Sequence, residues 1–442
     1  PPPPPPGSGT YPEVASTGEP IIHASGIVSL TMNQTGYEII GITGMHDNGL
    51  SVYRNAMAGT WTRQVLLSSI YGSNVVHNAK FSKDTTGEYI ISHGYEEGHI
   101  HVHKKTSTST WGTYEVWSAN TNKKGFYFSV STSIGMQRFV IADVNASNRE
   151  EYKVYKKDVG ETWIIEDVLQ TGFFGNWWKG VEMDENGSRV VTMGPGHINL
   201  WIRGAGGSWT KKSNIAIPPP LTSGPIDHLN PYPGFDYSNH NLYGADPTNE
   251  LSRNGFSMSD DGNYLSICTT SGLYNALDGG EIYVYRWIGN TYTLDSRILV
   301  SSFCNYGTIS TSMYPENGAA TCLNYDGTVM LVGLKYSNDV RKGYEAVWVL
   351  TRSGSTWSGS KQLILQDPSP WTDTGSLTTS TGWDLSLYHA SNYPTNPDLK
   401  GYNFSLSEHP VTINKYGNMA ATTAPTLVFN NPQTQGGIAW TF

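Results

Sequence analysis

The stretch VEMDENGSRVVTM, residues 181–193, carries a local pattern that is repeated along the whole chain. An apolar segment ends at Met183, a polar turn contains Gly187, and a second apolar segment begins at Val190. Glycine adopts a positive φ without steric cost, so this order of residues is typical of a tight β-hairpin. We therefore expect two antiparallel strands here, joined by a turn in which the glycine has a positive φ.

The same pattern occurs seven times between residues 30 and 423. Each copy has one glycine in its turn, and each is followed by a third segment of apolar and aromatic residues. Because self-similarity is the mark of a repeat architecture, the seven hairpins predict seven similar units. The other copies are LTMNQTGYEIIGI (30–42), KFSKDTTGEYIIS (80–92), VSTSIGMQRFVIA (130–142), FSMSDDGNYLSIC (256–268), CLNYDGTVMLVG (322–333) and VTINKYGNMAATT (411–423).

A third and a fourth strand follow in six of these units. The third segment alternates β-branched and aromatic residues, and after a short polar turn a Ser/Thr-Trp/Tyr pair opens the fourth. The third-strand aromatic position and the Trp are eight residues apart in four units, as from Tyr53 to Trp61. The pairs are Thr60-Trp61, Thr110-Trp111, Thr162-Trp163, Ser208-Trp209, Thr291-Tyr292 and Thr356-Trp357.

The seventh unit ends at Phe442, inside its third segment, without such a pair. Thr10-Tyr11, near the other end of the chain, supplies the missing one. Four-stranded units arranged radially form a β-propeller, and a strand taken from the N-terminus closes the ring without a frayed edge. We predict an all-β fold: a seven-bladed β-propeller of four-stranded antiparallel blades, the last blade closed by the N-terminal strand.

The segment PPPPPPGSG, residues 1–9, predicts a Pro-rich linker, with a polyproline II rod followed by a flexible joint. Residues 10–442 are then a single propeller domain. The chain starts at Pro1 rather than at Met and has no signal-peptide pattern, so we expect it to be processed or trimmed from something longer.

The repeated order of Asp-Gly turn, Tyr-containing strand and Trp resembles the broad FG-GAP and WD40-like kind of seven-bladed propeller over residues 8–442. The chain lacks the DxDxDG calcium loop of integrin-type FG-GAP blades and a run of Trp-Asp dipeptides, so calcium binding by that route is not expected. Similar Trp-rich repeats are associated with extracellular proteins and with virion components of phages and algal viruses. The resemblance therefore implies a binding or assembly role outside a cell or on a virion surface.

The connections predict that one rim of the disc is elaborated. Turns between strands one and two and between three and four share a rim and are short, whereas the connections on the opposite rim vary widely in length, as loops that carry function do. We expect insertions at about 213–255 and 366–404, with further long connections at 296–321 and 422–437. The aromatic residues of the two insertions are candidate binding residues: Tyr232, Phe235, Tyr237 and Tyr243 in one, Trp371, Trp383, Tyr388 and Tyr393 in the other.

Three functions fit such a rim. The first is a non-enzymatic structural role, in which the rim recognises protein subunits of a larger virion or extracellular assembly. The second is lectin-like binding of a surface glycan by aromatic stacking, and the third is cleavage of a glycan by a sialidase-like propeller. A purely structural alternative is that the aromatic residues fold the insertions over the central channel as a lid.

Composition excludes several classes of partner. The formal net charge of −9 and the pI near 5.7 argue against nucleic-acid binding, which needs clustered Lys and Arg. The sequence contains no run of 18 apolar residues, so membrane insertion is not expected. Cys268, Cys304 and Cys322 are too few and too far apart for a disulfide framework or a CxxC metal site, and we expect them to be buried as small hydrophobic residues.

Three motifs could carry chemistry, and we expect none of them to do so. His99, His101 and His103 share one strand face and could hold zinc, but His103 occupies the aromatic position that is Tyr53 and Tyr155 in other units, which favours packing. KDVGETW (157–163) resembles a sialidase Asp box, which is a structural turn. Asp227-His228 and Asp236 with His240 have no nucleophile at a defined spacing. We therefore predict no catalytic residues, no metal and no cofactor.

Overall fold

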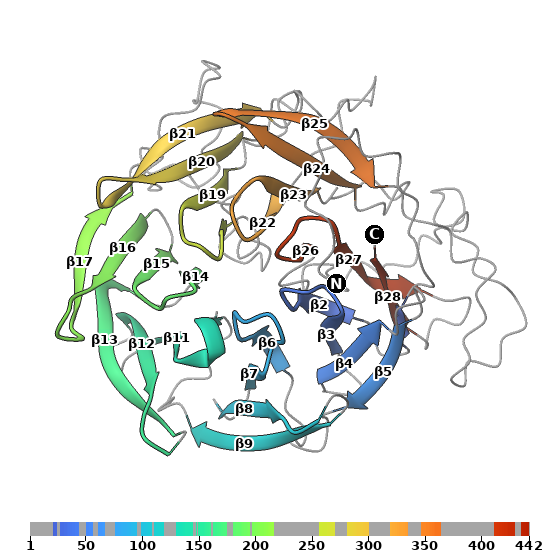
Figure 1. Cartoon of the computed structure of the whole chain (residues 1–442), viewed down its shortest axis with the longest axis horizontal. Coiled ribbons are helices and arrows are strands. Elements are labelled where there is room, and N and C mark those ends of the chain that lie inside the picture. The colour runs from blue at the N-terminus through green and yellow to red at the C-terminus, as the bar shows by residue number, and fades with distance from the viewer. Residues whose placement is uncertain are drawn as a thin grey trace, which may run out of the picture.

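In the computed structural model the strands form four-stranded antiparallel sheets around a central axis, so the chain is an all-β propeller (Figure 1). The structure describes residues 21–23, 27–43, 50–55, 61–66, 76–94, 99–107, 110–118, 130–144, 147, 149–160, 162–174, 180–194, 197–215, 256–269, 281–299, 319–334, 346–363, 411–428 and 435–441.

Six sheets each contain four strands that are consecutive in sequence, and we call them blades 1 to 6. Blade 1 is β2 (Ile27–Met32), β3 (Glu38–Thr43), β4 (Leu50–Asn55) and β5 (Trp61–Leu66). Blade 2 is β6 (Val76–Phe81), β7 (Tyr89–Gly94), β8 (His99–Lys105) and β9 (Trp111–Ser118). Blade 3 is β10 (Val130–Thr132), β11 (Arg138–Val144), β12 (Arg149–Lys157) and β13 (Trp163–Phe174), with a short 3-10 turn, η2 (Ile134–Met136), between its first two strands.

Blade 4 is β14 (Gly180–Met183), β15 (Arg189–Gly194), β16 (His197–Arg203) and β17 (Trp209–Asn214). Blade 5 is β18 (Phe256–Met258), β19 (Tyr264–Thr269), β20 (Glu281–Ile288) and β21 (Thr291–Leu299). Blade 6 is β22 (Ala319–Leu323), β23 (Val329–Leu334), β24 (Ala346–Ser353) and β25 (Thr356–Leu363). The fourth strands of blades 1 to 6 begin at or next to the Trp or Tyr of the predicted pairs, which confirms that part of the repeat.

A further four-stranded sheet, which we call the terminal sheet, joins the two ends of the chain in the order β1-β28-β27-β26. It consists of β1 (Ile21–His23), β26 (Val411–Ile413), β27 (Ala420–Val428) and β28 (Gln435–Thr441). Ile21 pairs with Ala439 and His23 with Gly437. The N-terminal strand of this sheet therefore begins at Ile21, whereas the predicted one opened at Thr10-Tyr11, which lies outside the described residues.

The described strands next to the first predicted insertion end close to its predicted bounds of about 213–255, because β17 ends at Asn214 and β18 begins at Phe256. Two other predicted connections were too long. Strand β21 extends to Leu299, which shortens the connection predicted at 296–321. The segment predicted as a loop at 422–437 is largely strand, because β27 runs to Val428 despite Pro425. A shift in the strand register between Ala424 and Leu427 accommodates this proline in β27.

The seven hairpin glycines all have a positive φ, from 53° at Gly135 to 82° at Gly36, as predicted. A side chain at the start of each turn holds it closed, and we call this Asn, Asp or Ser the cap residue. In blade 4 the cap residue Asp184 accepts hydrogen bonds from the backbone N–H groups of Ser188 and Arg189, at 2.7 and 2.9 Å. The cap residues are Asn33, Ser82, Ser133, Asp184, Ser259, Asn324 and Asn414.

The hydrophobic core lies between neighbouring blades. One cluster contains Tyr89 and Ile91 of blade 2 together with Phe139 and Trp163 of blade 3. The Trp163 ring packs edge-on against Tyr89 with their centroids 5.7 Å apart, and its indole N–H donates to the Met136 carbonyl at 2.9 Å. The Trp of the Asp-box-like turn is therefore a packing residue between blades, as predicted.

Charged or aromatic pairs also join neighbouring blades. The first residue of a second strand meets the residue near the end of the next blade's third strand. Lys105 of blade 2 pairs with Glu38 of blade 1 at 2.5 Å, and Arg352 of blade 6 donates to the Tyr264 hydroxyl of blade 5 at 2.7 Å. We call each such pair an outer clasp.

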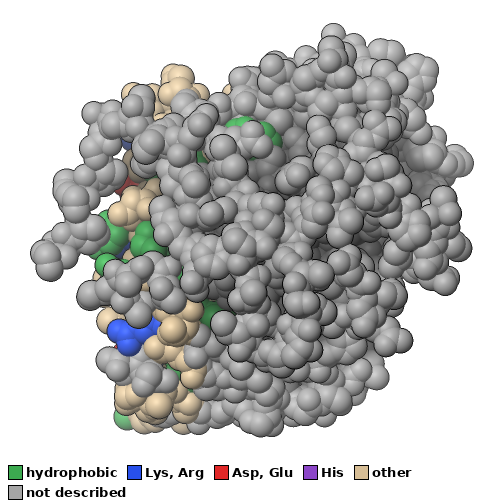
Figure 2. Space-filling model, turned by 90° about the vertical axis from the view of Figure 1, so that its right-hand side faces the viewer, with side chains coloured by type: hydrophobic (Ala, Val, Ile, Leu, Met, Phe, Trp, Pro, Cys, Tyr) green, Lys and Arg blue, Asp and Glu red, His purple; other side chains and the backbone are tan. Residues whose placement is uncertain are grey.

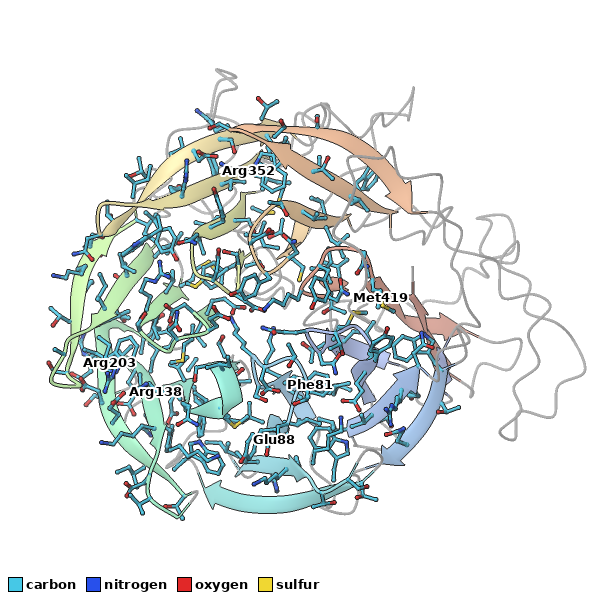
Figure 3. The ribbon with its side chains drawn as sticks, in the orientation of Figure 1. Phe81, Glu88, Arg138, Arg203, Arg352 and Met419 are labelled. Atoms are coloured by element: carbon cyan, nitrogen blue, oxygen red, sulfur yellow. The ribbon has the colours of Figure 1, made fainter. Side chains whose placement is uncertain are left out.

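Blades 3 and 4 place an arginine at both clasp positions, Arg138 and Arg203, and Glu166 of β13 lies between them (Figure 3). The Glu166 carboxylate accepts from Arg138 at 2.9 Å and from Arg203 at 2.8 Å. Burial would raise the pKa of Glu166, but hydrogen bonds from Arg203, Arg138 and Trp209 outweigh burial and lower the pKa to about 2. The negative charge of Glu166 therefore offsets the repulsion between Arg138 and Arg203.

The glycine turns pack directly on the preceding blade. A Cβ at Gly262 would lie 2.6 Å from Arg189 Nη2 and 2.7 Å from the Cβ of Asp184, both in blade 4. Gly354 in the turn between β24 and β25 has a similar φ of 62°, against 68° at Gly262, but a Cβ there would have no atom within 4 Å.

We predict that Gly262→Ala destabilises the protein more than Gly354→Ala does. Both variants incur about 1 kcal/mol for a positive φ, and the crowded site at Gly262 adds about 2 kcal/mol of overpacking. Chemical denaturation of the two variants measures the difference in the free energy of unfolding. Equal losses would show that the turn does not pack on the preceding blade.

Candidate functional site

A polar cavity of about 110 Å³ lies where the first strands of the blades and of the terminal sheet meet. Its lining follows the repeat: the residue two before the cap residue lines it in all seven units, and the residue just after the cap residue lines it in five. The first set, the inner ring, is Thr31, Lys80, Ser131, Glu182, Ser257, Cys322 and Thr412. The second set, the outer ring, includes Gln34, Lys83, Asp260, Tyr325 and Lys415.

Strand alternation explains why these residues face the axis. In β6, Ala79 and Phe81 are buried in the core between blades 1 and 2, so Lys80 between them points to the opposite face. In β2, Leu30 and Met32 are likewise buried and Thr31 faces the cavity. Core packing therefore requires apolar residues on either side of Lys80 and Thr31, but it does not set the residue type at the ring positions themselves.

Backbone hydrogen bonds join the turns of neighbouring blades around this cavity. The backbone N–H of Glu185 in blade 4 donates to the Asp260 carbonyl of blade 5 at 2.7 Å, and that of Asp261 donates to the Tyr325 carbonyl of blade 6 at 3.1 Å. The Lys415 N–H of the terminal sheet donates to the Gln34 carbonyl of blade 1 at 2.9 Å. Similar bonds join Lys83 to Ser133 and Ile134 to Glu185.

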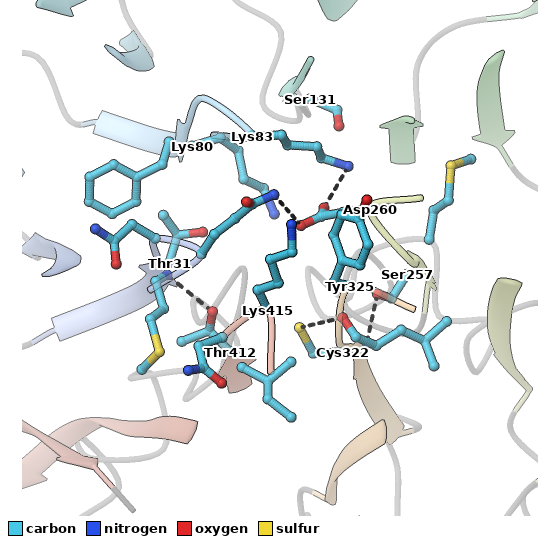
Figure 4. Close-up of a pocket in the computed structure, with 18 of the residues that line it drawn as sticks. Thr31, Lys80, Lys83, Ser131, Ser257, Asp260, Cys322, Tyr325, Thr412 and Lys415 are labelled. Atoms are coloured by element: carbon cyan, nitrogen blue, oxygen red, sulfur yellow. Dashed lines mark hydrogen bonds and ion pairs between the residues drawn. The ribbon is translucent and has the colours of Figure 1, made fainter. Parts of the chain in front are cut away.

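A polar bridge crosses the cavity between blades that are not neighbours (Figure 4). The Lys83 ammonium of blade 2 lies 3.0 Å from the Asp260 carboxylate of blade 5 and donates to the Met183 carbonyl at 2.6 Å. Gln34 of blade 1 donates to the other Asp260 oxygen at 3.2 Å. Burial would lower the pKa of Lys83, but Asp260 and Glu182 outweigh it and raise the pKa above the ordinary value.

The remaining side chains of the cavity have different partners. Glu182 accepts from the Ser131 hydroxyl at 3.0 Å. The Tyr325 hydroxyl donates to Glu185 at 2.6 Å, which together with burial raises the pKa of that tyrosine, and the Lys415 ammonium lies 3.8 Å from the centre of the Tyr325 ring. Burial raises the pKa of the Cys322 thiol to about 11, so the group is a thiol rather than a nucleophilic thiolate at neutral pH.

Cys322 departs from the prediction. Cys268 is buried and free, as a small hydrophobic residue would be, but Cys322 is free and only half-buried at the cavity. Its place in the inner ring explains the difference, since Cys322 lines the cavity while it also packs against the core cluster that contains Val411 and Ile413. Cys304 lies outside the described residues.

None of the rim residues predicted from sequence lies in the part of the chain that the structure describes. This holds for the eight aromatic residues Tyr232, Phe235, Tyr237, Tyr243, Trp371, Trp383, Tyr388 and Tyr393, and for the Asp227, His228, Asp236 and His240 group. The ring residues of the cavity were not predicted. Aligning the seven hairpins on their cap residues would have revealed one column of mostly polar residues inside the apolar first strands, and a second column of varied residues in the turns.

His103 of β8 packs as predicted for an aromatic position, and the side chain of His99 lies outside the described part of the structure. His103 is opposite Ile90 in the sheet, as Tyr53 is opposite Ile39 in blade 1. The rings of His101 and His103 are both buried and stack 6.1 Å apart at 3°. Among the described residues no group of three or more His, Cys, Asp or Glu is placed to hold a metal ion. The described helical segments include none that is long and apolar enough to span a membrane.

We predict that His103 makes the protein sensitive to acid. Burial, and then the charge of His101, lowers the pKa of His103 to about 3, well below its ordinary value of 6.5. The unfolded chain therefore takes up a proton between pH 6.5 and 3 that the folded chain does not. Across this window the free energy of unfolding decreases by about 1.4 kcal/mol for each unit by which the pH is lowered. His103→Phe should flatten this fall in denaturation measured from pH 7 to 4. An unchanged slope would contradict the assignment.

No protein-family model matches the chain, and no curated protein matches it. Among solved structures, it is similar to a functionally unknown protein from Desulfotomaculum acetoxidans DSM 771, with 11% identity and a TM-score of 0.48 over 76% of this chain and 84% of that one. It is also similar to a chain of a mitotic checkpoint complex, with 10% identity and a TM-score of 0.49 over 98% and 96% of the two chains.

A third similar structure is hydrazine synthase from Kuenenia stuttgartiensis, with 10% identity and a TM-score of 0.49 over 94% of this chain and 96% of that one. At these identities and TM-scores, the likenesses assign neither a family nor a function to the chain.

Proposed function

We propose that this chain is a non-enzymatic binding module: a closed ring of seven blades that recognises a protein partner through one rim, as a structural part of a virion or an extracellular assembly. In this proposal the terminal sheet is the seventh blade. It is supported by contacts on both sides of that sheet, since Lys415 bonds to Gln34 of blade 1 and a Cβ at Gly417 would lie 2.8 Å from Val329 of blade 6.

The distribution of connections is the observation that carries the proposed role. The described turns between first and second strands, such as 184–188, and between third and fourth strands, such as 354–355, are short. The longest connections, 216–255, 300–318 and 364–410, all join a fourth strand to the next first strand and therefore start from the opposite rim. Long connections collected on one rim of a rigid scaffold favour recognition by that rim.

The cavity supports binding rather than catalysis. Asp260 is engaged by Lys83 and Gln34, and Glu182 by Ser131, so both carboxylates already accept hydrogen bonds from the protein. In the view of Figure 2, hydrophobic, Lys or Arg, and other side chains of the described residues lie next to one another along one margin of the molecule.

Ring closure can be tested by truncation. We predict that deleting residues 1–24 lowers Tm by about 3 °C, because β28 loses its partner strand and becomes an open edge. Deleting residues 1–9 alone, the predicted linker, should leave Tm unchanged. Equal Tm values for the two truncations would show that β1 does not close the ring.

The partner-binding rim can be tested by site-specific photo-crosslinking in the native assembly. A benzoylphenylalanine at Trp371, in the second insertion, should crosslink to a protein partner. The same group at Val159, which is 96% exposed in the turn between β12 and β13 on the opposite rim, is the control and should not. Equal crosslinking from both positions would reject the assigned rim. Saturable binding on a glycan array that Trp371→Ala abolishes would favour the lectin alternative, and turnover of a polysaccharide the enzymatic one.

A further inference from the structure

The cavity on the axis is positively charged although the chain is acidic. Among the described residues its charged lining is Lys80, Lys83 and Lys415 together with Glu182 and Asp260, so three ammonium groups face two carboxylates. The chain as a whole has a formal net charge of −9. A local excess of positive charge between low-dielectric walls raises the local concentration of anions.

Within the described residues, two of the three cations have no carboxylate partner. Lys83 is neutralised by Asp260 at 3.0 Å. Neither Lys80 nor Lys415 forms an ion pair with any carboxylate in the part of the chain that the structure describes. Lys80 comes from blade 2 and Lys415 from the terminal sheet, on either side of blade 1, and both side chains extend into the cavity (Figure 4). An ammonium group in a confined site has lost part of its hydration shell. An anion that takes the place of this water forms a charge-assisted hydrogen bond with the ammonium and stabilises it.

Hydroxyl groups of the inner ring add neutral donors. Ser257 Oγ accepts from the Leu323 N–H at 3.0 Å, and Thr412 Oγ1 accepts from the Met32 N–H at 3.1 Å. Each oxygen is thus held in place by a backbone donor, and neither hydroxyl proton has an acceptor among the described residues. Each is left to donate to a ligand in the cavity.

We propose that the polar cavity on the axis of this propeller binds a small oxyanion, a phosphate or carboxylate group. Lys80 and Lys415 are its charge partners, and the Ser257 and Thr412 hydroxyls are its neutral donors. Glu182, in the same inner ring as Lys80, opposes anion binding and limits the charge that the site accepts. The site is separate from the rim proposed to bind a protein partner, and one can exist without the other.

Isothermal titration calorimetry on the full chain tests the site, with inorganic phosphate in one series and citrate in another. We expect saturable binding of at least one probe, and the probe that binds identifies a phosphate or a carboxylate. Lys80→Met and Lys415→Met should each raise Kd about tenfold, as expected for the loss of one charge-assisted partner. Lys211→Met, an exposed lysine on β17, is the matched control and should leave Kd unchanged.

Glu182→Gln separates the proposal from general damage to the fold. It removes the opposing negative charge, so it should lower Kd several-fold for the same probe, opposite in sign to the lysine variants. Absence of saturable binding with both probes would overturn the proposal. So would equal effects of Lys80→Met and Lys211→Met, or weaker binding by Glu182→Gln.

Discussion

The contact of each glycine turn with the preceding sheet is the constraint on which the ring depends. At six of the seven hairpins a side chain added to the glycine would touch the sheet before it, at either its cap residue or the first residue of its second strand. Gly36 of blade 1 meets Asn414 and Met419 of the terminal sheet, so the same contact links the two ends of the chain. Glycine is therefore required at this turn position for two reasons: the backbone has a positive φ, and a Cβ would collide with the preceding sheet.

The outer clasps occur at the same positions between different blades, but the residue types that form them differ from one pair of blades to another. The positions held by Glu38 and Lys105 between blades 1 and 2 are held by Tyr264 and Arg352 between blades 5 and 6. Between blades 4 and 5 the roles are reversed, because Arg189 lies on the second strand and stacks 4.7 Å from the Trp287 ring of the third. Any cation with an acid or aromatic partner satisfies the clasp, and two arginines need the added charge of Glu166.

The sequence predicted the features that repeat and missed those that do not. Glycine turns, the Trp or Tyr that opens the fourth strand and the aromatic position of His103 recur at fixed spacing, so their physical role could be read from comparison of the units. The terminal strand at Ile21 has no such marker, and the predicted pair Thr10-Tyr11 lies outside the described residues. Pro425 suggested a loop, but a local shift in register keeps it within β27. The cavity was missed because its positions have no residue type common to all units: the inner ring alone contains Thr, Lys, Ser, Glu and Cys.

That variability has a physical cause and indicates where function can differ between otherwise equal blades. Residues on either side of Lys80 are fixed by the packing of blades 1 and 2, and those beside Thr31 by the packing around blade 1. Side chains at the ring positions meet across the axis, and some of them also bond to backbone groups, as Thr412 does to Met32. Lys83 is paired with Asp260 from across the cavity, whereas among the described residues Lys80 and Lys415 have no carboxylate partner and Lys415 lies against the Tyr325 ring. Glu182 offsets part of this charge, and the positive charge that remains favours an anionic ligand.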